Sequence, residues 1–212
     1  MRSVALVDYG SGNLPSALKA LRRAAEAVGG AQVGATDDPE AIARADAVVL
    51  PGVGAFAACM DALRARPGVI EAMETAVRQR GVPFLGICVG LQLMADQGRE
   101  FGLTPGLGWI SGEVRRLEPA NSAFKLPHMG WNSIERPKGP LFSGLATGDH
   151  MYFTHAYAIF PRVAGVAAGW TDHGGLFVSA VTSGNLSGVQ FHPEKSQDAG
   201  ARLLRNFLEW RP

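Results

Sequence analysis

A cysteine in this chain stands where a thiol-dependent acyl-transfer reaction would need its nucleophile. Cys88 lies between two glycines in the segment PFLGICVGLQLM (83–94), after an apolar run and before residues of helical character. In such a G-x-nucleophile-x-G turn, the side chain is exposed and the helix N-terminus favours a thiolate and offers N–H groups to an oxyanion. The alternative is a small buried hydrophobic residue, which is the usual state of a free cysteine.

The base that such a nucleophile requires is found in the segment GVQFHPEKS (188–196). His192 follows a strand-like run, and Pro193 is expected to keep the segment extended. Residues i and i+2 of an extended chain face the same side, so Glu194 can orient His192 and stabilise its imidazolium form. The segment alone could equally be a surface loop. With Cys88, however, it completes a Cys-His-Glu triad in chain order.

Oxyanion donors are expected from the segment LPGVGAF (50–56), a glycine-rich turn after a buried strand. The backbone N–H groups of Val53 and Gly54 could supply one donor, and Val89, directly after the nucleophile, the second. Alone, the segment also fits a simple strand-to-loop turn. The other cysteine, Cys59, has no such turn, and we expect it to pack in the core or on a helix.

The elements that must position these residues alternate in the first half of the chain. Apolar runs predict strands at residues 3–10, 32–36, 47–52 and 82–88, and amphipathic spacing predicts helices at 14–30, 39–46 and 69–81. Strands without polar alternation, separated by helices, predict an α/β fold with a central, mainly parallel sheet covered by helices on both faces.

The second half of the chain has short strand-like runs in place of alternating strands and helices. After about residue 105, short strand-like runs are broken by Gly, Pro and Asn, and a helix closes the chain within residues 198–212. These runs predict an antiparallel extension of the sheet. No repeat or linker divides the sequence, so we expect one domain over residues 1–212.

Composition excludes several classes of function. A net charge of +1 gives no basic footprint for nucleic acid, and no apolar run reaches the length of a membrane-spanning helix. The short apolar run in MRSVALVDYG ends at Asp8 without a cleavage pattern, so we expect no secretion signal. Two cysteines cannot form a disulfide framework, which favours a cytoplasmic setting.

Two other kinds of ligand site find little support. The segment YGSGN (9–13) carries Pro15 where a dinucleotide-binding motif has its third glycine, so a glycine turn is the better interpretation. His128 and His155 lack a Cys or carboxylate cluster at metal-ligand spacing, so we expect no metal.

The motifs around Cys88, Val53 and His192 together resemble those of class I glutamine amidotransferases. Three further segments, DYGSGNLPSALKAL (8–21), LPHMGWN (126–132) and YFTHAY (152–157), resemble the glutaminase subunits of imidazole glycerol phosphate synthases. The resemblance implies hydrolysis of L-glutamine through a γ-glutamyl thioester on Cys88, with His192 as general base and then acid. No cofactor is implied.

The resemblance also implies a partner and further contacts. The partner would be a (β/α)₈-barrel cyclase subunit, which uses the ammonia to make imidazole glycerol phosphate and AICAR in histidine biosynthesis. The expected glutamine contacts are Gln92 for the amide, Glu100 for the amino group, and the backbone of His155, Ala156 and Tyr157 for the carboxylate. The expected residues at the interface with the barrel are Asn13, Trp131, Tyr152 and Lys195.

A few positions depart from the pattern of that family. Val89 stands where Leu is usual, Leu91 replaces Met, and Ala156 stands where Ser or Thr is common, which could weaken glutamine binding. Three alternatives remain: a glutaminase subunit of another amidotransferase, a stand-alone γ-glutamyl hydrolase, and an inactive regulatory module. The barrel-facing motifs argue against the first two, and the complete triad argues against the third.

Overall fold

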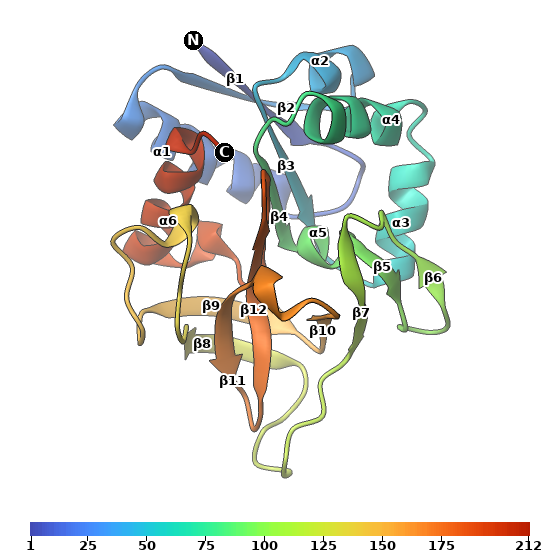
Figure 1. Cartoon of the computed structure of the whole chain (residues 1–212), viewed down its shortest axis with the longest axis vertical. Helices are drawn as coiled ribbons and strands as arrows, with labels where there is room; N and C mark the ends of the chain where they lie inside the picture. The colour runs from blue at the N-terminus through green and yellow to red at the C-terminus, as the bar shows by residue number, and fades with distance from the viewer.

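A seven-stranded sheet runs through the centre of the computed structural model, which describes residues 1–212 (Figure 1). In spatial order the strands are β11 (Ala167–Asp172), β12 (Leu176–Ser183), β13 (Leu186–Val189), β4 (Phe84–Cys88), β3 (Ala47–Gly52), β1 (Arg2–Val7) and β2 (Ala31–Thr36). The five strands from β13 to β2 are parallel, and β12 and β11 add to them in antiparallel fashion. The predicted parallel sheet with an antiparallel extension is therefore confirmed.

Helices cover both faces of this sheet, as the unbroken apolar strands predict. Helices α1 (Leu14–Val28) and α6 (Gln197–Glu209) pack together on one face (Figure 1). The other face carries α2 (Pro39–Arg44), α3 (Phe56–Arg64) and α4 (Val69–Met73), which continues into a π-helical segment, η1 (Glu74–Gln79). Every residue of β3 and β4 is buried between these layers. None of the helices is long and apolar enough to cross a membrane.

The remaining strands form two smaller sheets, which corrects part of the prediction. One sheet contains β10 (Tyr157–Pro161), β7 (Ile110–Arg116), β5 (Ala95–Gly98) and β6 (Thr104–Pro105), and a separate ribbon pairs β8 (His128–Ser133) with β9 (His150–His155). Short 3₁₀ turns lie at η2 (Pro140–Phe142), η3 (Ala164–Val166) and η4 (Pro193–Lys195). Only β11 and β12 extend the central sheet.

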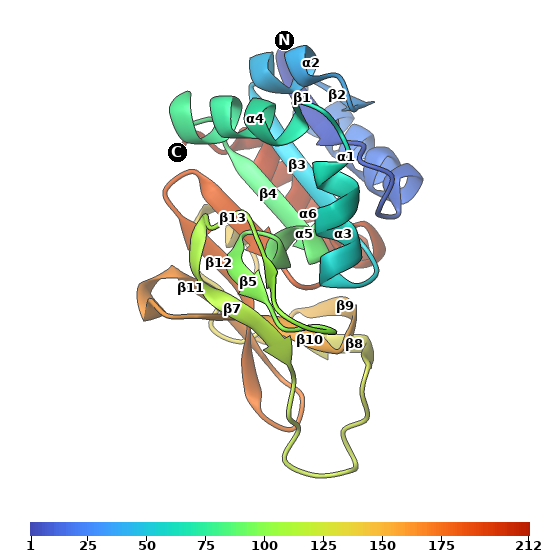
Figure 2. The same ribbon diagram turned by 90° about the vertical axis from the view of Figure 1, so that its right-hand side faces the viewer.

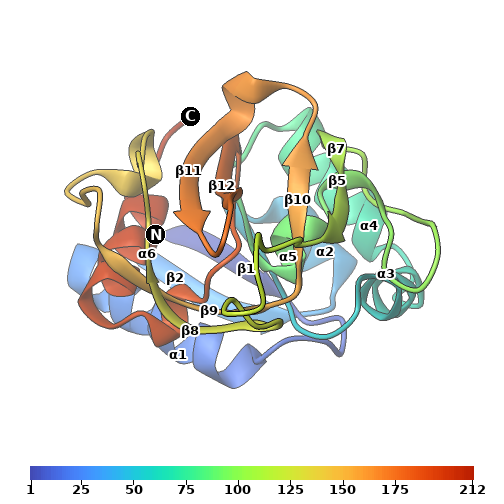
Figure 3. The ribbon, with the colours of Figure 1, turned by 90° about the horizontal axis from the view of Figure 1, so that it is seen from below.

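The β8–β9 ribbon stacks on its neighbours instead of pairing with the edge of the central sheet. The Phe153 ring lies in edge contact with the rings of Phe177 and Phe191, at centroid distances of 6.1 and 5.6 Å. Figure 3, seen from below, shows β8 and β9 running side by side across the molecule, separate from β11 and β12. Alternating apolar residues predict a strand with a buried face, but they do not distinguish stacking on a sheet from pairing with its edge.

Helix α5 (Val89–Gln92) is much shorter than the sequence suggests, and it rests directly on the sheet. It follows β4 without a connecting loop, and Figure 2 shows it at the lower end of that strand. A Cβ atom on Gly90 would overlap the carbonyl oxygen of Leu50, and a Cβ on Gly86 would lie 2.6 Å from the carbonyl oxygen of Gly90. Glycine at these two positions therefore allows the backbones of β3, β4 and α5 to lie in direct contact.

Substituting Gly90 with alanine tests this backbone contact. The new methyl group would have to displace the β3 backbone, so we expect Gly90→Ala to lower the free energy of unfolding by about 3 kcal/mol. Urea unfolding would measure the loss. The matched control is Gly34→Ala in β2, where a Cβ meets nothing within 4 Å. Equal stability of the two variants would contradict the prediction.

Candidate active site

Cys88 ends β4 in a strained backbone conformation. Its φ is 53° and its ψ is −110°, outside the regions that residues with a side chain favour. Such a conformation costs about 1–3 kcal/mol and clusters at functional positions. The side chain is only 3% exposed, but it lines a cavity of about 240 Å³. Cys88 is thus buried, as the hydrophobic interpretation required, and placed on a turn that faces a cavity.

The cavity gathers most of the residues that the sequence analysis singled out. Its walls come from the turn after β3, the start of α5, the loop after β5, the β9–β10 junction and the segment after β13. The lining residues are Val53, Gly54, Cys88, Val89, Gln92, Glu100, Thr154, His155, Ala156, Tyr157 and His192. Thr154 is the only one of them that the sequence analysis did not name. The cavity suits a ligand of the size of one amino acid.

His192 and Glu194 form a buried pair beside this cavity. His192 Nδ1 lies 2.8 Å from Glu194 Oε1, and the two side chains are 2% and 3% exposed. Burial alone would lower the pKa of His192, but interactions with Cys88 and Glu194 outweigh it and raise the pKa to about 10. His192 Nε2 makes no hydrogen bond, so this nitrogen is free to exchange a proton with a group in the cavity.

The local backbone after His192 differs from the extended segment that the sequence analysis expected. His192 itself is extended, but residues Pro193–Lys195 form the 3₁₀ turn η4. Proline fits the first position of a helical turn because its φ is already suitable and its missing N–H is not needed there. Glu194 therefore reaches the imidazole from a turn, and the expected i, i+2 geometry of a strand is wrong.

Strand β9 holds the His192 segment in place. The His192 N–H donates to the Tyr152 carbonyl over 2.9 Å. Ser196 closes the arrangement: its hydroxyl donates to the His192 carbonyl at 2.6 Å and accepts from the Tyr152 N–H at 3.0 Å. The backbone of Tyr152 thus fixes the position of the general-base candidate.

The turn that carries Val53 and Gly54 is anchored by two hydroxyl groups. Tyr9 donates to the carbonyl of Pro51 at 2.8 Å, and Ser11 donates to that of Val53 at 2.9 Å. The N–H groups of Val53 and Gly54 make no hydrogen bond within the protein. Two unpaired N–H groups on the wall of the cavity are available to an anionic ligand atom.

Cys59 also belongs to this anchor. It is buried on α3, as expected, and its sulfur lies 3.3 Å from the Val53 carbonyl oxygen. Burial raises the pKa of the Cys59 thiol, so it stays protonated and can donate that hydrogen bond. The roles of Tyr9 and Ser11 were not predicted from the YGSGN segment, which has the pattern of a plain glycine turn, because their partners lie 42 residues away in the chain.

Gln92 and Glu100 both lie in the cavity wall, with partners in the protein. Gln92 Nε2 donates to the Tyr157 carbonyl at 2.9 Å and to Gln190 Oε1 at 3.1 Å. Glu100 Oε2 accepts from the Phe56 N–H at 2.8 Å, at the start of α3, where the helix dipole favours a carboxylate. Because both N–H groups of the Gln92 amide have partners in the protein, only its side-chain oxygen is available to a ligand.

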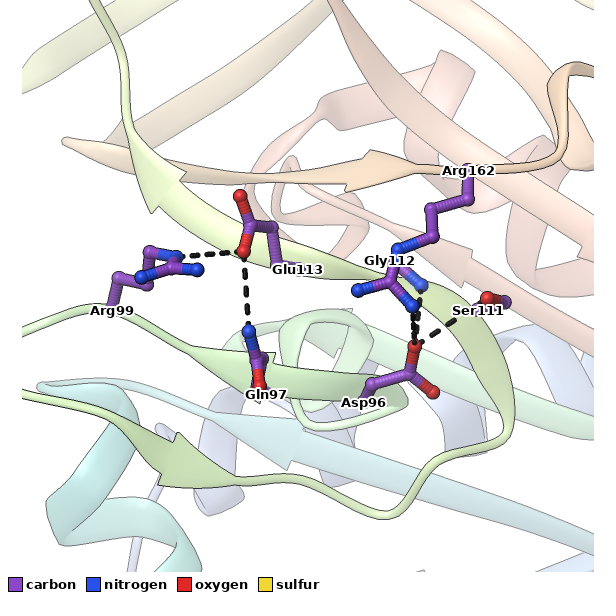
Figure 4. Close-up of polar contacts among 7 residues, drawn as sticks. All are labelled: Asp96, Gln97, Arg99, Ser111, Gly112, Glu113 and Arg162. Atoms are coloured by element: carbon purple, nitrogen blue, oxygen red, sulfur yellow. Dashed lines mark hydrogen bonds and ion pairs between the residues drawn. The ribbon is translucent and has the colours of Figure 1, made fainter.

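Polar contacts between β5 and β7 position the loop that carries Glu100 (Figure 4). Glu113 accepts from Arg99 at 2.7 Å and from Gln97 at 3.3 Å. Asp96 accepts from the Gly112 N–H at 3.0 Å and from Arg162 at 3.2 Å. Residues 95–98 form strand β5, and Glu100 follows that strand in a loop.

Two buried histidines lie behind the β9–β10 junction. His155 Nδ1 is 2.9 Å from the Tyr157 carbonyl oxygen, and His155 Nε2 is 3.1 Å from His128 Nδ1. Burial lowers the pKa of His128 to about 4 and that of His155 to about 3. Both rings are therefore neutral at neutral pH, in contrast to His192.

The residues expected at a partner interface lie outside the cavity. Trp131 and Tyr152 face each other across the β8–β9 ladder, with ring centroids 6.0 Å apart, and Lys195 Nζ lies 5.5 Å from the Tyr152 ring. Trp131 is 46% exposed, and Met129, two residues earlier on the same strand, is 64% exposed. Asn13 lies apart from this group, at the start of α1.

Gln190, which is fully buried beside Cys88, was not among the residues predicted for the site. A signal for it was present, because Gln190 precedes His192 by two residues and side chains two apart on an extended chain face the same side.

Comparison with known proteins gives matches to a single family over nearly the full length of the chain. The family model described as glutamine amidotransferase class-I matches residues 5–210. The chain is 56% identical over 215 residues to a protein of Caulobacter vibrioides described as imidazole glycerol phosphate synthase subunit HisH, with 100% of both chains covered. It is 50% identical over 212 residues to a protein of Rhodospirillum rubrum with the same description, covering 99% of each.

Solved structures agree with the architecture. One described as a glutamine amidotransferase has a TM-score of 0.72 at 21% sequence identity, covering 97% of both chains. A glutamine amidotransferase from Thermotoga maritima has a TM-score of 0.63 at 17% identity, covering 98% of this chain and 96% of that one. At these identities the likeness concerns the fold.

The neutral histidine pair predicts a dependence of stability on pH. A histidine in the unfolded chain has a pKa near 6.5. As the pH falls below that value, the unfolded state binds protons, whereas folded His128 and His155 stay neutral because their pKa values are lower. The free energy of unfolding should therefore fall by up to about 1.4 kcal/mol per pH unit for each histidine. Urea unfolding between about pH 7 and pH 5 would measure this slope.

His128→Asn should reduce that slope, because it removes one of the two groups. The control is His150→Asn, since His150 is exposed and its substitution should leave the slope unchanged. A wild-type slope in His128→Asn would contradict the prediction.

Proposed function

The chain belongs to the class I glutamine amidotransferase family, and we propose that it is the glutaminase subunit of an imidazole glycerol phosphate synthase. In this role it hydrolyses L-glutamine and supplies ammonia for histidine biosynthesis. One observation carries the assignment of the chemistry: Cys88, on a strained turn, faces the same cavity as His192, and Glu194 orients the His192 ring.

The first half of the proposed reaction forms a thioester. In the starting state of the proposed cycle, the thiol proton of Cys88 already lies on His192 Nε2, so that a thiolate faces a charged imidazole ring. The sulfur then attacks the side-chain carboxamide carbon of glutamine. The raised pKa of His192 keeps the ring positively charged at neutral pH, which is the state that can protonate the leaving nitrogen. The C–N bond then breaks, ammonia leaves, and a γ-glutamyl group remains on the sulfur.

The second half returns the enzyme to its starting state. His192, now neutral, takes a proton from water as the water attacks the thioester carbon. The C–S bond breaks, and glutamate leaves with the Cys88 thiolate restored. Glu194 supports both halves, because its carboxylate fixes Nδ1 as the donor nitrogen and stabilises the charged ring.

The oxyanion of both tetrahedral intermediates would be held by backbone N–H groups of Val53 or Gly54 and of Val89. The turn before α3 is anchored through the Pro51 and Val53 carbonyls, and its N–H groups are unpaired. In the proposal this turn takes its active orientation only when the liganded partner binds, so the chain alone is weakly active.

Substrate recognition divides between the ends of the glutamine molecule. The negative charge of Glu100 suits the amino group, and the backbone of His155, Ala156 and Tyr157 suits the carboxylate. Gln92 would contact the reacting amide through its side-chain oxygen, since both its N–H groups have partners in the protein. Ala156 contributes no hydroxyl, so recognition depends on the backbone there.

The partner in this proposal is a (β/α)₈-barrel cyclase that forms a heterodimer with the chain in the cytoplasm. Its contact surface would include Asn13, Trp131, Tyr152 and Lys195. The exposed apolar side chains of Met129 and Trp131 on β8 support this placement, because exposed aromatic residues and methionines are enriched at interfaces. Ammonia would pass to the cyclase beside this surface.

A glutamine-mimicking electrophile tests the proposed nucleophile. We expect the label to add mass at Cys88 and not at Cys59, and to do so faster when the cyclase and its ligand are present. Peptide mass mapping would locate the label. Absence of labelling under both conditions would favour an inactive module, and equal glutaminase rates with and without the liganded cyclase would contradict the activation.

Substituting Glu194 with glutamine tests the orienting role. The amide keeps the size of the side chain but cannot stabilise a charged His192, so kcat in the complex should fall by roughly 10²–10⁴-fold. Steady-state glutaminase assays would measure it, together with a downward shift of the pH at which His192 titrates. Glu209→Gln, at an exposed position of α6, is the matched control and should behave as wild type.

A further inference from the structure

A second polar side chain reaches the sulfur of Cys88 from the neighbouring strand. In the parallel register of β13 and β4, Val189 pairs with Ile87, so the next residues along, Gln190 and Cys88, lie side by side. Gln190 is 0% exposed, and its Nε2 lies 3.6 Å from Cys88 Sγ. Because buried amide groups keep hydrogen-bond partners, the sulfur is a partner that Gln190 needs.

The carbonyl group of Tyr157 determines which way the Gln190 amide points. A backbone carbonyl only accepts hydrogen bonds, so the Gln92 atom 2.9 Å from it is the amide nitrogen. That nitrogen also lies 3.1 Å from the side chain of Gln190 and donates to it, so Gln190 presents Oε1 on this side. Its Nε2 is then directed at the sulfur as a donor.

Two histidines hold the same carbonyl group from another direction. His155 Nδ1 must donate to Tyr157 O, so His155 Nε2 accepts from His128 Nδ1. His128 Nε2 in turn accepts from the side-chain amide of Asn132, at 3.2 Å. The two lone pairs of the Tyr157 carbonyl are thus both used by buried donors, which fixes the polarity of the whole chain of hydrogen bonds.

We infer that Gln190 is a further catalytic residue of this site, which donates an N–H group to the thiolate of Cys88 and holds the sulfur toward the cavity. The inference rests on the proposed glutaminase function for its role in turnover. The direction of the donor rests on the buried contacts from Tyr157 through Gln92 to Gln190.

The donor acts on charge and moves no proton. When the thiol proton passes to His192, the sulfur keeps the electron pair and a negative charge develops at a buried position. An N–H group aimed at that charge stabilises the thiolate relative to the thiol, since hydrogen bonds to ionised groups are the stronger ones. As the S–C bond forms, the charge moves to the substrate oxygen and the oxyanion donors take over.

Two substitutions test the direction of this hydrogen bond. Gln190→Met removes the donor at similar length, and Gln190→Glu keeps the shape but places an acceptor beside the sulfur. Iodoacetamide alkylation of Cys88, followed by peptide mass mapping, should slow roughly tenfold at neutral pH in Gln190→Met. It should slow further in Gln190→Glu, with a higher pH midpoint in both variants. Gln32→Met, at an exposed position of β2, should match wild type.

A space-filling role predicts the reverse order, because Gln190→Glu is the closer match in shape. That order, or wild-type alkylation in both folded variants, would overturn the inference. Alkylation needs no glutamine turnover, so it separates this inference from the proposed function. A chain without glutaminase activity that still shows the expected order would refute the proposed function and support the role of Gln190.

A measurement on the unsubstituted side chain covers the case in which the variants do not fold. With nitrogen-15 in the glutamine side chains, the buried amide signal of Gln190 should titrate with the same pH midpoint as the alkylation of Cys88. In Cys88→Ala that titration should disappear. A Gln190 signal that is independent of pH in the wild type would overturn the inference.

Discussion

The direct backbone contact between α5 and the ends of β3 and β4 is the constraint on which the site depends. Gly90 lies against the carbonyl of Leu50, and Gly86 lies against Gly90, with no side chain between them. The chain must therefore turn from strand to helix within one residue, and Cys88 takes the positive φ that this turn requires. The surrounding core holds the strained residue in place.

The parallel register of the sheet brings the chemistry together at one edge. Gly52 at the end of β3 pairs with Cys88 at the end of β4, and Gln190 follows β13 at the same level. Carboxyl ends of parallel strands open onto a common crevice, so three short segments far apart in the chain share one cavity. The environment then separates the histidines: His192, beside a carboxylate and a thiol, has a raised pKa, while burial lowers that of His155.

Strand β9 links the cavity to the exposed surface. The backbone of Tyr152 holds His192, and its ring meets Trp131 on the outside of the ribbon. At the end of the same strand, the carbonyl group of Tyr157 accepts hydrogen bonds from both His155 Nδ1 and Gln92 Nε2. His192 is therefore bonded to this strand directly. Cys88 is connected to it only indirectly, through Tyr157, Gln92 and Gln190.

The sequence by itself determined the parallel sheet, the first helix with its glycine stop, the turn at Cys88 and the candidates His192 and Glu194. These features follow from local patterns of apolar residues, glycines and neighbouring polar groups. The family resemblance added Gln92, Glu100 and residues 155–157 of the cavity wall. Only the tertiary structure decided that the later strands form separate sheets, that Ser11 anchors Val53, and that Gln190 meets Cys88. Such contacts join residues far apart in the chain, and they leave no local pattern because the packing of whole elements sets their geometry.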